Sequence, residues 1–179
     1  TMTTISESPT RFGLLYVGMD DGNIHVSKDG GYSWSLISNK LPKGLYVSRV
    51  VASAFKEGRV YASLNGYRND NFLPYLYVSD DYGMNWKQIG KDLPTEPINV
   101  IREDNKYDSI LYVGTDGGLY LSLSQGNSFM MWNKGLPKSI PIHDLIAHPR
   151  DNEIILGTHG RSIYIANLGG VEQLMRGDV

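Results

Sequence analysis

The chain has 179 residues, 41% hydrophobic and 20% charged, which suffices for one globular domain with a sizeable core. Its 17 basic and 19 acidic residues give a net charge of −2, so the composition offers no basic excess for binding nucleic acid. The absence of cysteine excludes disulfides, thiolate metal sites and a cysteine nucleophile. No apolar run approaches the ~20 residues that span a membrane, and the start, TMTTISESPT, lacks the basic and apolar regions of a signal peptide.

The sequence pattern of the first unit of the chain predicts a series of short strands. A candidate strand at Thr3–Ser6 is followed by LLYVGMDDGNIHVS from Leu14, in which two alternating apolar runs flank a tight-turn Asp-Gly pair. The segment SKDGGYSW then runs from Ser27 to Trp34, a further strand follows, and the unit closes on Leu-Pro at Leu41. The order is therefore strand, strand, turn, strand, SKDGGYSW, strand, Leu-Pro.

The same order recurs along the chain. SKDGGYSW at Ser27 returns as SDDYGMNW at Ser79 and as SLSQGNSF at Ser122, and each copy is followed 14 residues later by Leu-Pro. The copies begin 52 and 43 residues apart, which brackets the ~40–50 residues of a β-propeller blade. A fourth unit begins with IHDLIAHPRDNEIILGTHGRSIYIANL, but no copy of the SKDGGYSW segment follows it.

We therefore predict an all-β chain, residues 1–179, built of β-propeller blades of four antiparallel strands. Three blades are expected to be complete and one partial, so that the chain is a segment of a larger propeller. The expected blades span about residues 3–44, 45–96, 97–140 and, partially, 141–168, and residues 169–179 form a tail with one plausible helical turn at Val171–Met175.

The repeated segment resembles the bacterial neuraminidase repeat, or Asp-box, S-x-D-x-G-x-x-W, which occurs in sialidases, xyloglucanases, the sortilin receptor domain and photosystem II assembly propellers. The longer segment LLYVGMDDGNIHVSKDGGYSW, from Leu14 to Trp34, further resembles the sequences of large bacterial sortilin-like or glycosyl-hydrolase-like repeat proteins. The third copy departs from the motif, with serine at position 124 and phenylalanine at position 129. The resemblance implies the fold, because these families share blades rather than one chemistry.

The box is interpreted as a structural hairpin and not as a catalytic acid, because a catalytic group is normally unique rather than repeated in each blade. The aspartates are expected to accept hydrogen bonds from backbone N–H groups a residue or two ahead, the glycines to supply positive φ, and the aromatic rings to pack between adjacent sheets. The structural box residues are Ser27, Asp29, Gly31, Trp34, Ser79, Asp81, Gly83, Trp86, Ser122, Gly126 and Phe129. In the resembled families this hairpin lies on the face away from the active site, which directs attention to the opposite end.

Polar side chains collect in the turns between the second and third strands of the units, and loops on a rigid scaffold are common binding sites. The candidate ligand- or partner-binding residues are Asp20, Asp21, Arg68, Asp70, Asp116, His159 and Arg161. For Asp20, Asp21 and Asp116 turn chemistry is the favoured interpretation, and for His159 and Arg161 a structural role, with Arg161 tying a loop down, competes with ligand contact. The insertion NGYRNDNFLP is interpreted either as an interaction loop or as solvated decoration. A glycosidase would need two carboxylates ~5–5.5 or ~6.5–9.5 Å apart.

The favoured function is a non-catalytic propeller scaffold that binds a polysaccharide, peptide or protein, within a larger exported bacterial protein outside the cytoplasm. The alternatives are a portion of a glycoside hydrolase and a sortilin-like peptide-binding receptor or assembly factor. No cofactor and no metal site are predicted, since the four histidines are dispersed. Nucleic acid and membrane insertion are not expected, whereas unpaired blade edges lead us to expect self-association, with two chains completing a seven- or eight-bladed ring.

Overall fold

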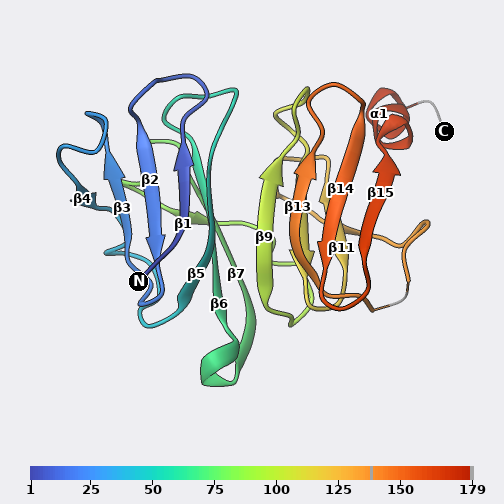
Figure 1. Cartoon of the computed structure of the whole chain (residues 1–179), viewed down its shortest axis with the longest axis horizontal. Coiled ribbons are helices and arrows are strands. Elements are labelled where there is room, and N and C mark those ends of the chain that lie inside the picture. Colours follow the sequence, from blue (N-terminus) through green and yellow to red (C-terminus); the bar gives the residue numbers. More distant parts are fainter. Residues whose placement is uncertain (138, 178–179) are drawn as a thin grey trace.

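The computed structural model describes residues 1–137 and 139–177 and is almost entirely β-structure. Within these residues, fifteen strands form four antiparallel sheets of four, four, four and three strands, with one α-helix near the C-terminus (Figure 1). The predicted fold class, three complete blades and one partial blade, is confirmed.

The strands of each sheet follow one another along the chain. The first sheet contains β1 (Met2–Glu7), β2 (Leu15–Met19), β3 (Ile24–Ser27) and β4 (Ser35–Leu36). The second contains β5 (Tyr46–Ala52), β6 (Val60–Gly66), β7 (Asn71–Ser79) and β8 (Lys87–Gln88). The third contains β9 (Ile98–Glu103), β10 (Leu111–Thr115), β11 (Leu119–Ser122) and β12 (Met130–Trp132). The fourth contains β13 (Ile142–Ala147), β14 (Glu153–Thr158) and β15 (Ile163–Asn167).

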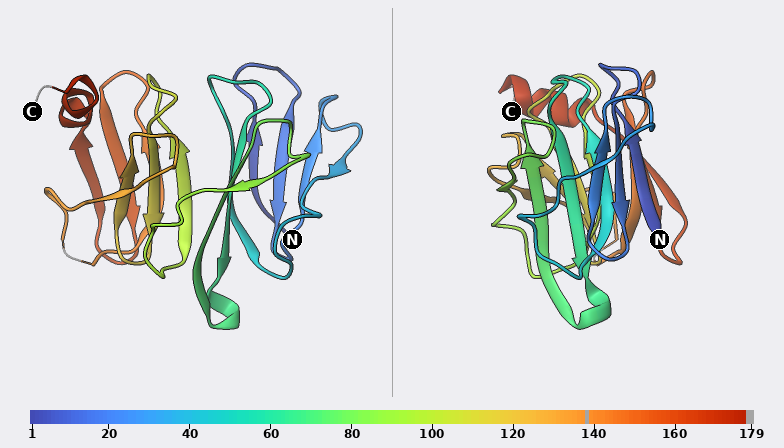
Figure 2. Two further views of the ribbon diagram at one scale, coloured as in Figure 1. Left: turned by 180° about the vertical axis from the view of Figure 1, so that it is seen from behind. Right: turned by 90° about the vertical axis from the view of Figure 1, so that its left-hand side faces the viewer.

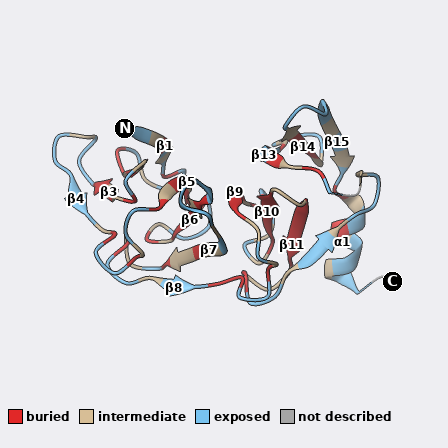
Figure 3. Cartoon of the chain, turned by 90° about the horizontal axis from the view of Figure 1, so that it is seen from below, coloured by how far each residue is buried: buried red, intermediate tan, exposed pale blue. Residues whose placement is uncertain are grey.

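The sheets fan out from their first strands. Seen from below in Figure 3, β1, β5, β9 and β13 lie side by side along one side of the molecule, and the short strands β4 and β8 lie far from them. We call the sheets blades 1 to 4. This arrangement leaves one flank of blade 1 and one flank of blade 4 without a neighbouring sheet among the described residues.

The core lies between the blades and not within one central layer. Each of three clusters of buried apolar residues joins two adjacent sheets: one includes Tyr16 and Val47 of blades 1 and 2, another Tyr61 and Ile98 of blades 2 and 3. The third joins blades 3 and 4 and includes Val171 of the helix α1 (Gly169–Arg176). Because side chains alternate between the faces of a strand, each internal blade contributes to two clusters.

The innermost strand of every blade carries an irregularity at the same place. The register of β1, β5, β9 and β13 shifts at Thr3, Ser48, Asn99 and His143 respectively. A β-bulge leaves one residue unpaired and turns its side chain. Three of these side chains reach the next blade: Thr3 Oγ1 donates to the Val47 carbonyl at 2.7 Å, Ser48 Oγ to that of Ile98 at 2.7 Å, and Asn99 Nδ2 to that of Ile142 at 3.3 Å.

Each box forms the hairpin between the third and fourth strands. In the first, Ser27 Oγ accepts the Gly31 N–H at 2.8 Å, while Asp29 accepts the backbone N–H of Ser33 at 2.9 Å and its hydroxyl at 2.5 Å. The aspartate thus bonds four residues ahead, not one or two as expected. Gly31 has φ +95°, and Gly83 and Gly126 have φ +86° and +83°.

The box aromatics differ from one another in burial. Trp86 packs between blades 1 and 2 and donates its indole N–H to the Ile37 carbonyl at 2.8 Å, and Phe129 packs between blades 2 and 3. Trp34 is 41% exposed and donates its indole N–H to the Gly31 carbonyl of its own hairpin. It therefore does not pack between two sheets, as was expected of all three rings. The reason is that no described sheet precedes blade 1.

Two further segments differ from their sequence interpretation. The helix α1 runs over Gly169–Arg176 and is longer than the single turn expected. The insertion is not a loop but an extension of the β6–β7 hairpin, closed by the 3₁₀ turn η1 (Tyr67–Asn69). Both views in Figure 2 show this hairpin projecting beyond the ends of the other strands.

Candidate functional site

The end of the molecule from which η1 projects, which we call the loop end, carries a hollow. It has a volume of about 540 Å³ and is bordered by the first strands and second-to-third-strand turns of blades 2, 3 and 4. The lining residues are Tyr46, Asn65, Tyr67, Arg68, Asn99, Asp116, Pro141, His143 and His159. We refer to this site as the loop-end hollow. The box hairpins and α1 lie at the opposite end (Figure 1).

A chain of side-chain hydrogen bonds runs along the floor of the loop-end hollow. Asn65 Nδ2 donates to Asn99 Oδ1 at 3.1 Å, and Asn99 Nδ2 donates to Asp116 Oδ1 at 2.8 Å. These bonds fix the orientation of the Asn99 amide, since its nitrogen must face the carboxylate and the Ile142 carbonyl. The Asp116 carboxylate keeps further acceptor capacity, because an ionised carboxylate has about four lone-pair sites.

Aromatic side chains, two imidazole rings and the Arg68 guanidinium form the walls. The Arg68 guanidinium carbon lies 4.9 Å from the centre of the Tyr46 ring, a cation–π contact that holds an otherwise exposed side chain against the wall. On the blade 4 side, the His143 and His159 rings lie 5.1 Å apart. The site therefore combines aromatic faces, amides, a carboxylate, a guanidinium and two imidazoles.

The structure brings three of the seven candidate binding residues together, namely Arg68, Asp116 and His159. Asp20 lies on blade 1 beside the N-terminal ammonium, and the hydrogen bond from that group lowers the pKa of Asp20 below its usual value. Asp21 accepts from the backbone and side chain of Asn23, at 3.0 and 2.8 Å, and so closes its own turn.

The two remaining candidates are exposed and do not line the loop-end hollow. Asp70 ends η1 in the left-handed conformation, with φ 53°, and Arg161 lies in the β14–β15 turn. The contacts of Asp21 with Asn23 match the turn interpretation, whereas the roles of Asp70 and Arg161 stay predictions.

Sequence reasoning missed Asn65, Asn99 and His143. Asn99 and His143 belong to the innermost strands, where a polar residue reads as part of the alternating pattern. The available signal was their common register with Thr3 and Ser48, which marks one bulge per blade. A bulge at a rim commonly re-aims a side chain towards a binding site.

Beside the loop-end hollow, two arginines of the inner strands share one carboxylate. Arg49 Nη2 of β5 lies 2.8 Å from Asp144 Oδ1 of β13, and Arg102 Nη2 of β9 lies 3.6 Å from the same atom. Burial and the neighbouring Arg49 lower the pKa of Arg102. Two guanidiniums against one carboxylate leave this part of the inner surface with an excess of positive charge.

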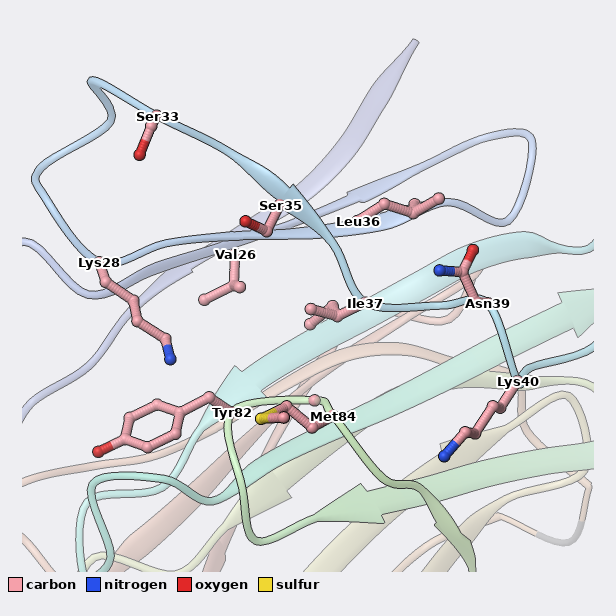
Figure 4. Close-up of a pocket in the computed structure, with 11 residues that line it drawn as sticks. Val26, Lys28, Ser33, Ser35, Leu36, Ile37, Asn39, Lys40, Tyr82 and Met84 are labelled. Carbon is pink, nitrogen blue, oxygen red and sulfur yellow. The ribbon is translucent and has the colours of Figure 1, made fainter.

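A second hollow, of about 460 Å³, lies between the box hairpins of blades 1 and 2 (Figure 4). Lys28 Nζ lies 4.2 Å from the centre of the Tyr82 ring across it, and Ile37 and Met84 form its apolar part. None of the seven predicted binding residues lines it. It is the outer part of a blade junction.

Neither a metal-binding cluster nor a membrane-spanning helix occurs in the described part of the chain. No group of three or more His, Cys, Asp or Glu side chains there could hold a metal ion. Nor do residues 1–137 and 139–177 contain a helix with the length and apolar content needed to cross a bilayer.

Four antiparallel sheets packed flank to flank around a common inner edge define this chain as a set of β-propeller blades. No family model matches it.

Solved structures share this fold. The GH74 xyloglucanase from Xanthomonas campestris superposes with a TM-score of 0.72 and 15% identity, over 92% of this chain and 29% of that one. The GH74 enzyme of Niastella koreensis gives a TM-score of 0.70 and 17% identity, over 94% and 23%. YCF48 bound to D1 peptide gives a TM-score of 0.58 and 15% identity, over 93% and 65%. At these identities the likeness concerns the fold alone.

One curated relative was found by sequence. Vacuolar protein sorting/targeting protein 10 of Laccaria bicolor is 28% identical over 126 residues, which is 64% of this chain and 8% of that protein. The chain thus spans a small part of this relative and under a third of the two GH74 structures. These likenesses are consistent with a propeller of the Asp-box type.

Proposed function

We propose that the chain is a non-catalytic binding scaffold and that the loop-end hollow holds an oligosaccharide segment of a larger ligand. The observation that carries the proposal is the composition of the hollow: tyrosine rings beside convergent amide, carboxylate, guanidinium and imidazole groups, on rigid strands. Ligand sites typically join apolar faces with a few fixed polar groups. Sugar rings offer faces for the tyrosines and hydroxyls for the polar groups.

Binding is favoured over hydrolysis because of the number of carboxylates. Among the described residues that line the hollow, Asp116 is the only one with a carboxylate, and glycoside hydrolysis uses two. The nearby Glu96 accepts hydrogen bonds from Thr115 Oγ1 at 2.6 Å and from Tyr120 Oη at 3.5 Å, so it serves the blade. The likeness to GH74 enzymes keeps a portion of a glycoside hydrolase as the alternative, with the second carboxylate on another segment.

Peptide binding is the second candidate, and the observation that favours it is the positive inner surface at Arg49 and Arg102. The solved structure described as YCF48 bound to D1 peptide agrees with that use of the fold. An acidic peptide along the inner strands would meet these guanidiniums. In either case an extracytoplasmic location, in a larger bacterial protein, stays a prediction.

Isothermal titration calorimetry with xyloglucan oligosaccharides, cello-oligosaccharides and an acidic peptide separates these candidates. We expect saturable binding of an oligosaccharide, weakened about tenfold or more by Asp116→Asn and by His159→Ala, since each removes a polar contact. Arg161→Ala is the matched control, because Arg161 lies at the same end outside the hollow, and it should change the affinity less than about twofold. Binding of the peptide alone, lost in Arg102→Ala, would replace the first candidate by the second.

A further inference from the structure

The two outer flanks of this blade array have the features of the internal blade junctions. In blade 4, Leu145, Leu156 and Tyr164 pack towards blade 3. By strand alternation the neighbouring residues lie on the other face. This trailing flank consists of Ile146, Ile155, Gly157, Ile163 and Ile165. Three of its isoleucines are exposed, Ile146 by 53%, Ile163 by 70% and Ile165 by 62%.

The outer face of blade 1 is the counterpart. Thr4 and Ser6 accept backbone N–H groups of blade 2, and Tyr16 packs against it, so the alternate residues face outward. This leading flank consists of Met2, Ile5, Leu15, Val17 and Met19. Met2 and Ile5 are 55% and 58% exposed. In blade 2 the residues at the same register positions are buried against blade 1.

At two of the internal junctions a glycine, which has no side chain, leaves space for a side chain of the following blade. We call this space the seat. A Cβ on Gly18 would lie 2.4 Å from the Val47 side chain, and one on Gly114 would lie 2.7 Å from that of Ile142. Each glycine therefore makes room for a branched residue of the following blade. Gly157 occupies the same position in blade 4, and there the nearest atom to such a Cβ is the Asp144 carbonyl oxygen at 3.6 Å.

All three internal junctions share a polar contact, which we call the register contact. Thr3, Ser48 and Asn99 each donate to the carbonyl of the residue before the bulge in the next blade. His143 stands at this position in blade 4. In blade 1, Met2 holds the place of Val47 and Ile142, both as a side chain for the seat and as a carbonyl for the register contact.

From these matches we propose that the trailing flank of one chain binds the leading flank of a second copy, head to tail, with Met2 of the second copy over Gly157 of the first. The contact is heterologous, and two copies that each use both flanks would close an eight-bladed ring. Among the described residues blade 4 has three strands, and α1 follows β15 where the other blades continue into the box hairpin. We therefore expect an affinity of about micromolar order, at the weak end for interfaces of this kind.

Sedimentation velocity over a range of about 1 to 200 µM tests the proposal. The expected result is a concentration-dependent species of twice the 20.0 kDa chain mass. Gly157→Leu fills the seat without backbone strain and should leave a monomer, as should Ile5→Lys on the leading flank. Met84→Lys, which alters a 69% exposed side chain on a box hairpin outside both flanks, is the matched control and should still dimerise.

A mixture of the two flank variants gives the sharpest result. Each variant keeps one intact flank, so a one-to-one mixture should form a dimer through one junction, weaker than the native one, although neither variant dimerises alone. A native chain that stays monomeric over the whole range would overturn the proposal and assign the flanks to blades of a different sequence. A dimer that persists in Gly157→Leu alone would also overturn it, because it would show a contact that does not use the trailing flank.

Discussion

At the scale of single residues, the repeated aspartate of the box acts through hydrogen bonds and not through proton transfer. Two bonds from Ser33 and one from Ser27 stabilise the charged form of Asp29 and hold its pKa at about 2, below the ordinary 3.8. Bonds from Asn85 likewise lower the pKa of Asp81. A carboxylate with so low a pKa makes a poor general acid near neutral pH.

The lowered pKa predicts an acid-dependent loss of stability. Because the folded pKa of Asp29 lies below its unfolded value, its contribution is complete above pH ~4 and is lost as the pH falls towards 2. Asp29→Asn should therefore lower the free energy of unfolding at pH 7 and flatten its decline between these values. Urea unfolding at several pH values measures both effects.

The third box provides the control for the urea unfolding of Asp29→Asn at several pH values. Ser124 holds the aspartate position and accepts the Ser128 N–H at 3.1 Å without an ionisable group. Ser124→Ala should lower the free energy of unfolding by the same amount at pH 3 and pH 7. An Asp29→Asn effect that is equally independent of pH would contradict the assignment.

The box glycines make a separate prediction. A Cβ on Gly83 would lie 2.3 Å from Ile37 Cδ1 and 2.9 Å from Ile37 Cβ, whereas one on Gly44 would have no atom within 4 Å, and both residues have positive φ. Gly44→Ala should cost about 1–2 kcal/mol of backbone strain. Gly83→Ala should cost a further ~1–3 kcal/mol for overpacking, and equal losses in chemical denaturation would argue against this close contact.

At the scale of strands and hairpins, the sequence predicted element types well and their details less well. Period-2 patterns and the aligned boxes located the strands, because those signals depend on local turns and alternation. The bulges were not predicted, since the polar residue that recurs in each inner strand, such as Asn99 or His143, is recognised as unpaired only when two strands are paired. For this reason only three of the nine residues that line the loop-end hollow, Arg68, Asp116 and His159, were among the predicted turn residues, and the bulge residues were not predicted.

The bulge contacts predict a cost at the blade junctions. Ser48 Oγ bonds the Ile98 carbonyl of the next blade and lies 2.8 Å from Ser63 Oγ. Ser48→Ala should lower the free energy of unfolding by about 1–3 kcal/mol, because it leaves partly buried acceptors unpaired. Ser35→Ala, at an exposed serine of β4, should stay within about 0.5 kcal/mol, and an equal effect of the two in urea unfolding would contradict the junction role.

At the scale of the whole molecule, the buried contacts are distributed over three blade junctions, and the groups of the proposed binding site are distributed over three blades. Each cluster of buried residues joins two sheets only, so neighbouring blades hold one another in place. The loop-end hollow takes groups from blades 2, 3 and 4, and its geometry therefore depends on two of the junctions. The box motif predicted the blades and the opposite end for function, but no single-sequence pattern reveals which distant turns converge.

The central claim is that the loop-end hollow binds a ligand without converting it. The most direct measurement incubates the chain with xyloglucan oligosaccharides, and follows bound ligand and new reducing ends in the same samples, for the native chain and for Asp116→Asn. We predict saturable binding to the native chain, weaker binding to the variant, and intact oligosaccharide in both. Release of reducing ends in proportion to the native chain, absent in Asp116→Asn, would contradict the account and identify an enzyme.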